Sequence, residues 1–101
     1  MEEEIEINGS EFWIKVVEFL QQNWALIENR KGKSIIWFIN DNSAIFDSLE
    51  FPNKEEAEAG LMWNGFSKFS ASNYPPFIQP PKPPFHRRMN NIYSSGRFWK
   101  Y

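Results

Sequence analysis

The sequence contains no cysteine and only one histidine. Without cysteine the chain has no disulfides, thiolate metal sites or cysteine nucleophiles, and this favours a reducing compartment, so we expect a cytoplasmic protein. No window approaches about 18 apolar residues, and the acidic start MEEEIEINGS lacks the basic and apolar regions of a secretory signal. We therefore expect a protein that neither spans a membrane nor is exported by that route.

Motifs for catalysis or cofactor binding are also absent. The sequence has no phosphate loop, nucleophile elbow, zinc motif or dinucleotide fingerprint, and His86 has no nearby partners for a metal site or a catalytic dyad. Residues 40–42 are oxygen-rich like the start of a calcium loop, but apolar residues occupy the later ligand positions. We predict a protein that is not an enzyme and holds no cofactor or metal. The enzyme alternative requires Asp47 to gather with His86 or with the arginines of the C-terminal segment.

Acidic residues are missing from the second part of the chain. Residues 1–58 contain all 13 acids and five bases, a net charge of 5 − 13 = −8, whereas residues 59–101 contain six bases and no acid, a net charge of +6. Because the two values nearly cancel, we favour a basic part that lies against its own acidic body. The alternative is a basic arm for an anionic partner.

Apolar and aromatic side chains, by contrast, are abundant, at 42% and 18% of the chain. This composition differs from that of disordered chains, and 101 residues are enough for one core. In SEFWIKVVEFLQQNW, Phe12, Val16, Phe19 and Leu20 recur at helical spacing, and Asn8 or Ser10 can cap the first turn. The pattern predicts a helix over about residues 10–23.

The next segments alternate or run apolar, as strands do. WALIEN places Trp24, Leu26 and Glu28 on one face of a strand, although continuation of the helix to residue 28 competes with this interpretation. SIIWFI, residues 34–39, is typical of a central strand covered on both faces, and AIFDSLEF, residues 44–51, is predicted to return as its antiparallel partner. RKGK and NDNS are predicted to form the turns.

PNKEEAEAGLMWNGF predicts a second helix. Asn53 and Glu56 have the spacing of a capping box, and Gly65 can close the helix with Phe66 beside it. We expect Ala57, Leu61 and Met62 to face inward. The predicted fold is α+β in the order α-β-β-β-α, with two helices packed on a three-stranded antiparallel sheet in a compact domain over residues 1–72.

Residues 73–101, NYPPFIQPPKPPFHRRMNNIYSSGRFWKY, are expected to form an extended segment. They contain six of the seven prolines and seven aromatic residues. A large aromatic left in water forgoes roughly 1.5–3 kcal/mol of burial, so we expect this segment to pack on its own domain. Exchange between chains and docking on a partner remain open, the latter because Pro80 with Pro83, and Pro81 with Pro84, have the spacing read by proline-binding modules.

The favoured function is stoichiometric binding to a protein partner, as by an inhibitor, an immunity-type protein or an adaptor. The predicted binding residues are Asp41, Glu55 and Glu58, which would attract a basic partner, and Trp63, which could point outward as an anchor or cover the sheet. The sequence does not identify the partner or the process, and it leaves monomer and dimer open.

The alternative function is nucleic-acid binding by the basic and aromatic C-terminal segment. The residues that would bind phosphates and stack on bases are Arg87, Arg88, Arg97, Trp99 and Lys100.

Asp47 is a carboxylate on a predicted strand face that is otherwise apolar, because alternation places it on one face with Ile45, Leu49 and Phe51. A bulge or an edge position that turns Asp47 outward is the favoured explanation, and pairing with an arginine of the C-terminal segment is the other.

Overall fold

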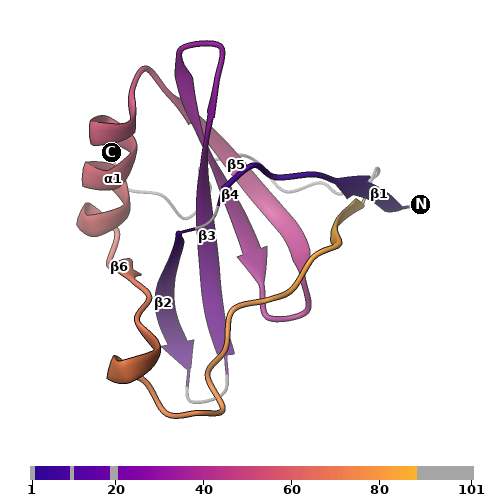
Figure 1. The fold of residues 1–101 in the computed structure, drawn as a ribbon, viewed down its shortest axis with the longest axis vertical. Coiled ribbons are helices and arrows are strands. Elements are labelled where there is room, and N and C mark those ends of the chain that lie inside the picture. The colour runs from indigo at the N-terminus through magenta and orange to yellow at the C-terminus, as the bar shows by residue number, and fades with distance from the viewer. Residues whose placement is uncertain (1, 10, 19–20, 89–101) are drawn as a thin grey trace.

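The computed structural model describes residues 2–9, 11–18 and 21–88 (Figure 1). This part of the chain forms one sheet, one α-helix and one short 3-10 helix: β1 (Glu2–Ile5), β2 (Phe12–Glu18), β3 (Gln21–Arg30), β4 (Lys33–Asn40), β5 (Ala44–Phe51), α1 (Lys54–Trp63), β6 (Ser67–Lys68), η1 (Ala71–Asn73) and β7 (Phe85–Arg88). No helix within these ranges is both long and apolar enough to cross a membrane.

The sheet is mixed and has the strand order β1-β7-β5-β4-β3-β2-β6. All neighbours pair antiparallel except β5 and β7, which are parallel. Helix α1 lies on one face of this sheet, against β3, β4 and β5 (Figure 1). The predicted fold of two helices on a three-stranded antiparallel sheet is therefore wrong, because the described chain has one α-helix and seven strands.

The first predicted helix, over residues 10–23, is replaced by the hairpin of β2 and β3. Trp13 lies opposite Ala25 and Ile14 opposite Trp24, and both Trp13 and Ile14 are only 2% exposed although they belong to opposite faces of the sheet. Apolar residues are so dense here that they satisfy the helical period and the strand period together. The β-branched and aromatic residues at positions 12–17 favour the strand, and residues 18–21 contain no glycine, proline, asparagine or aspartate, the residues by which a sequence signals the end of a strand.

The other strand predictions are confirmed, and their turns follow from local chemistry. β3, β4 and β5 form the expected antiparallel meander. Between β3 and β4, Lys31 and Gly32 both have positive φ, 51° and 79°, as in the two-residue hairpin turns that match strand twist. After β4, the Asn40 side-chain oxygen accepts hydrogen bonds from the amides of Asn42, at 2.8 Å, and Ala44, at 3.0 Å.

The second predicted helix is confirmed with both of its caps. The Asn53 side chain accepts the Glu56 amide at 2.8 Å. At the other end Gly65 has φ 87°, and the Phe66 amide donates to the Leu61 carbonyl at 2.9 Å, the closing bond of a Schellman motif. The expected inward position of Met62 is wrong, because its side chain is 61% exposed.

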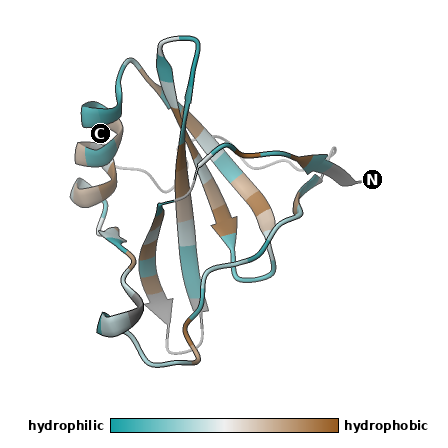
Figure 2. Ribbon diagram, viewed as in Figure 1, coloured by the Kyte–Doolittle hydropathy of each residue, from teal (hydrophilic) through white to brown (hydrophobic). Residues whose placement is uncertain are grey.

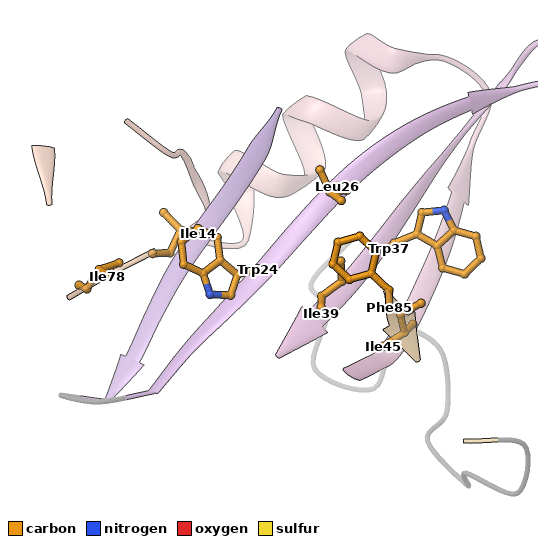
Figure 3. Close-up of a cluster of buried hydrophobic side chains, with 8 residues drawn as sticks. All are labelled: Ile14, Trp24, Leu26, Trp37, Ile39, Ile45, Ile78 and Phe85. Carbon is orange, nitrogen blue, oxygen red and sulfur yellow. The ribbon is translucent and has the colours of Figure 1, made fainter. Parts of the chain in front are cut away.

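Both faces of the sheet carry a buried apolar cluster, and Figure 2 shows apolar residues along the strands and polar ones at the β3–β4 turn. The helix-side cluster consists of Trp13, Ala25, Ile36, Phe38, Ala57, Leu61 and Phe66. The far-side cluster consists of Ile14, Trp24, Leu26, Trp37, Ile39, Ile45, Ile78 and Phe85. In Figure 3, Trp24 lies beside Ile14 and Ile78 at one end of the far-side cluster, and Trp37 lies near Phe85 at the other. The central strand β4 is therefore covered on both faces, as predicted.

Residues 74–84, here called the covering segment, run across the molecule to β7 (Figure 1). Ile78 and Phe85 are 8% and 5% exposed in the far-side cluster. At the β4–β5 turn, the Ser43 hydroxyl donates to the Lys82 carbonyl at 2.7 Å, and the Ser43 carbonyl accepts the His86 amide at 3.0 Å. The segment thus supplies Ile78 to the core and leads into β7, which supplies Phe85.

The aromatic residues of the C-terminal segment behave differently from one another. Phe85 is buried, Tyr74 stacks on Phe69 with ring centroids 5.5 Å apart, and Phe77 is 64% exposed. The remaining four, at positions 93, 98, 99 and 101, lie outside the described residues. Pro81 is buried, so its pairing with Pro84 is not open to a proline-binding module. The division into residues 1–72 and 73–101 stays a prediction.

Two adjacent residues test the role of the covering segment. Ile78→Ala should lower the free energy of unfolding by about 2–4 kcal/mol, because it leaves a cavity in the far-side cluster. The matched change Phe77→Ala removes an exposed side chain from the same segment and should change it by less than about 0.5 kcal/mol. Urea titrations followed by tryptophan fluorescence measure both values, and equal effects of the two substitutions would contradict a covering role.

Candidate protein-binding surface

Trp63 ends α1 on the side of the helix that faces away from the sheet. It follows the buried Leu61 by two positions, which places it about 200° around the helix. The Schellman motif turns Phe66 inward to pack in the helix-side cluster with Leu61, so the sheet is covered without Trp63. Its side chain is 72% exposed. The alternative in which Trp63 covers the sheet is therefore wrong.

Four further exposed residues share this side of the helix, and together with Trp63 they form the outer face of α1: Glu55, Glu56, Ala59, Met62 and Trp63. Ala59 precedes Met62 and Trp63 by three and four positions, so the three side chains are neighbours on one surface. The small Ala59 leaves room for an approaching chain between the acidic first turn and the apolar last turn. The outer face is thus an apolar patch with an acidic end.

The acidic end of the outer face is formed by Glu55 and Glu56. Both are exposed in the first turn, where the helix dipole stabilises negative charge. Glu58 lies to the side and is partly neutralised by Lys68, whose Nζ is 3.8 Å from its carboxylate. Lys68 also lies 3.6 Å from Glu11 and over the Trp13 ring at 5.7 Å. The charge available to a partner is therefore concentrated on the first turn.

The predicted binding residues are only partly brought together. Glu55 and Trp63 lie on the outer face, and Glu58 lies at its flank. Asp41 is in the β4–β5 turn, separated from the start of α1 by the eight residues of β5, about 26 Å of strand. Sequence reasoning missed Met62, although its position one residue after Leu61 already places it about 100° away from the buried direction.

The nucleic-acid prediction falls partly on β7. The register sets Arg87 opposite Glu3 and Arg88 opposite Glu2 of β1. The side chain of Arg87 is exposed. The other predicted residues, Arg97, Trp99 and Lys100, lie outside the described residues. Nucleic-acid binding stays a prediction.

Asp47 follows a bulge in β5. Ile39 pairs with Ile45 and Phe38 with Asp47, so Phe46 is an extra residue between the two pairs. The bulge sends Ile45 into the far-side cluster and leaves Asp47 half-buried on the helix side, where its carboxylate accepts the Ser48 amide at 2.8 Å. The expected bulge exists, but it redirects Ile45 rather than turning Asp47 outward.

Within residues 2–9, 11–18 and 21–88, no three histidine, aspartate or glutamate residues gather closely enough to hold a metal ion.

The most buried carboxylate is Glu28, which sequence reasoning did not single out. It is 1% exposed and accepts hydrogen bonds from Trp37 Nε1 at 3.0 Å, Arg30 at 2.9 Å and the Asn8 amide at 3.3 Å. Burial by itself raises the pKa of Glu28, but these three hydrogen bonds and the Arg30 charge together lower it below its ordinary value of 4.5. Glu28 thereby fixes the segment between β1 and β2 on the sheet.

Comparison of the chain with known proteins found no relative. No protein-family model, no curated protein and no solved structure matches the chain. The function proposed for the protein therefore rests on its own described residues.

Replacement of Glu28 by glutamine tests whether the buried carboxylate stabilises the fold. Glu28→Gln keeps the shape but removes the charge that accepts these hydrogen bonds, and should cost about 1.5–3 kcal/mol of unfolding free energy at pH 7. Because the folded pKa lies below 4.5, the contribution of the carboxylate is complete above pH 4.5 and is lost as the pH falls through the folded pKa. The difference between wild type and variant should therefore shrink between pH 5 and pH 3.

Glu50→Gln is the matched control. Glu50 pairs with Lys33 at 3.0 Å, but both side chains are more than half exposed, so the change should stay within about 0.5 kcal/mol. Denaturant titrations at each pH measure both variants. A Glu28→Gln difference that is the same at pH 3 as at pH 7 would show that the charge does not stabilise the fold.

Proposed function

We propose that the protein acts by stoichiometric binding to another protein through the outer face of α1, as an inhibitor, an immunity-type protein or an adaptor does. The observation that carries this proposal is Trp63, which is 72% exposed on the side of the helix opposite the buried Leu61. The core does not use this side chain, so packing of the fold does not explain why a tryptophan is exposed at this position.

Exposed tryptophan supports a binding role because of its energetics. Tryptophan buries a large area at interfaces and is enriched among the residues whose truncation costs most binding energy. Met62, 61% exposed, extends the apolar patch and can adapt its shape to a partner. The patch is small, and such patches act as the centre of an interface when polar residues surround them.

The acidic end of the outer face defines the chemistry of the partner. Glu55 and Glu56 would face basic side chains, and an acidic patch attracts a basic partner from a distance and raises the association rate. The partner we propose is a protein with an apolar pocket for Trp63 and a basic rim. The absence of cysteine supports an intracellular setting for this interaction.

Truncation of Trp63 separates binding from folding. Trp63→Ala should leave the unfolding free energy within about 0.5 kcal/mol of wild type. The affinity for the partner, recovered with the wild-type chain from the cells that make it, should fall at least about 30-fold, or about 2 kcal/mol. Phe77→Ala, which removes another exposed aromatic residue outside α1, should bind like wild type. Calorimetry on all three chains measures the affinities, and full affinity of Trp63→Ala would exclude this surface.

Charge reversal on the first turn tests the chemistry of the partner. Glu55→Lys should lower the association rate by about tenfold at low salt with little change in the dissociation rate, because steering acts before contact. Glu6→Lys makes the same change in net charge away from α1 and should have a smaller effect. Surface plasmon resonance at two salt concentrations measures the rates, and an equal or faster rate for Glu55→Lys would mean that the partner is not basic.

A further inference from the structure

The chain contains two asparagine-glycine pairs, Asn8-Gly9 and Asn64-Gly65. Asparagine is a chemically labile residue, and a following glycine makes it more reactive because glycine has no side chain to hinder its own backbone amide. The amide nitrogen of the glycine attacks Cγ of the asparagine and closes a five-membered succinimide ring. Whether a pair reacts in a folded protein depends on how firmly the structure holds these two groups.

The pair Asn64-Gly65 is held at both reacting groups. Asn64 Nδ2 donates to the Gly60 carbonyl at 2.9 Å, and the Gly65 amide, which would be the nucleophile, donates to the Met62 carbonyl at 3.1 Å. Asn64 is only 8% exposed and forms the C-cap of α1. The cap must therefore open before the Gly65 nitrogen can approach Cγ of Asn64.

The pair Asn8-Gly9 lies between β1 and β2, in a segment that is neither helix nor strand (Figure 1). Asn8 is exposed. Within the part of the chain that the structure describes, neither the Asn8 side chain nor the Gly9 amide makes a hydrogen bond. The nucleophile and the carbon that it attacks can therefore meet without the loss of a described hydrogen bond.

Asn8 and Gly9 also anchor this segment on the sheet. The Asn8 amide donates to the buried Glu28 at 3.3 Å, and a Cβ on Gly9 would lie 2.8 Å from the Ile27 carbonyl, so Gly9 packs directly on β3. When water reopens the succinimide, the product is aspartate or isoaspartate. Isoaspartate carries the chain through its side-chain carbon and lengthens the backbone by one atom, which the close contact between Gly9 and β3 cannot absorb without a shift.

We propose that Asn8-Gly9 is a modification site that converts spontaneously to aspartate and isoaspartate, and that the isoaspartate form holds this segment less firmly on the sheet. In the first step the bond between the Gly9 nitrogen and Cγ of Asn8 forms, the bond between Cγ and Nδ2 breaks, and the amide proton leaves with the ammonia. One water then adds to the ring, so the product has OH in place of NH2. The reaction needs no partner, and the proposal is therefore independent of the proposed function.

Both pairs can be followed in one sample. The folded chain is incubated in mildly alkaline buffer and digested with trypsin, which places Asn8 in the peptide of residues 1–15 and Asn64 in that of residues 55–68. Mass spectrometry measures the conversion of each peptide, and a zero-time sample corrects for conversion during digestion. Asn8 should convert at least about tenfold faster than Asn64, because two hydrogen bonds must break before Asn64 reacts.

Unfolding of the chain provides the matched control for these rates. In guanidinium chloride the contacts of both pairs are lost, so Asn8 and Asn64 should convert at similar rates. A ratio of the two rates that is no larger in the folded chain than in the unfolded chain would overturn the modification site, because the fold would then not select Asn8.

A second measurement tests the effect of isoaspartate on the fold. The variant Asn8→Asp adds the charge of the product without the extra backbone atom. The isoaspartate form, separated by ion-exchange chromatography, should unfold at a lower urea concentration than Asn8→Asp. Equal unfolding midpoints would overturn the proposed weakening, because the added atom would then leave the anchors at Glu28 and Ile27 intact.

Discussion

Burial of both faces of β4 is the constraint on which the rest of the structure depends. Ile36 and Phe38 point to the helix side and Trp37 and Ile39 to the far side, so the chain must provide two covers. α1 is one cover. The other is made by β7 and by an extended segment rich in proline, which lacks an amide hydrogen and therefore leaves fewer donors to satisfy where no strand or helix is formed. The proline-rich composition of residues 74–84 thus suits an extended segment that packs on the far side of the sheet without regular hydrogen bonding.

The same constraint leaves most of the surface of α1 outside the core. The helix contributes Ala57 and Leu61 to the core, and its Schellman motif adds Phe66, so one narrow stripe is enough for packing. The remaining surface is available for other uses. A partner that binds the outer face, as proposed, would contact exposed side chains that the core does not use, so we expect mutations there to change the affinity with little effect on stability.

Local chemistry made part of the fold predictable from the sequence. The Asn53 and Gly65 caps, the two turns of the meander and strands β4 and β5 each depend on residues a few positions apart. The helix over residues 10–23 was predicted wrongly because a dense apolar run fits either period, and only pairing with β3 decides between them. The pairing of β1 and β7 joins residues about 80 positions apart in sequence, which no local pattern encodes. In the candidate site, the place of Trp63 at the helix end was enough to predict its exposure as one of two alternatives. Asp41 was assigned to the site on its charge alone, and it lies in a different part of the fold. Glu28 does carry a signal in the sequence, because it is an acid on the same strand face as Trp24 and Leu26, where a buried carboxylate needs hydrogen-bond partners.

The order of strands in the sheet also affects how the protein behaves when crowded. The long apolar strands β3, β4 and β5 lie inside, and the outermost strands of the described chain are the four residues of β1 and the two of β6. Strands as short as these two offer little backbone for continued pairing with another molecule. We therefore expect growth of the sheet from molecule to molecule to be disfavoured at both ends of the described sheet, although 42% of the chain is hydrophobic.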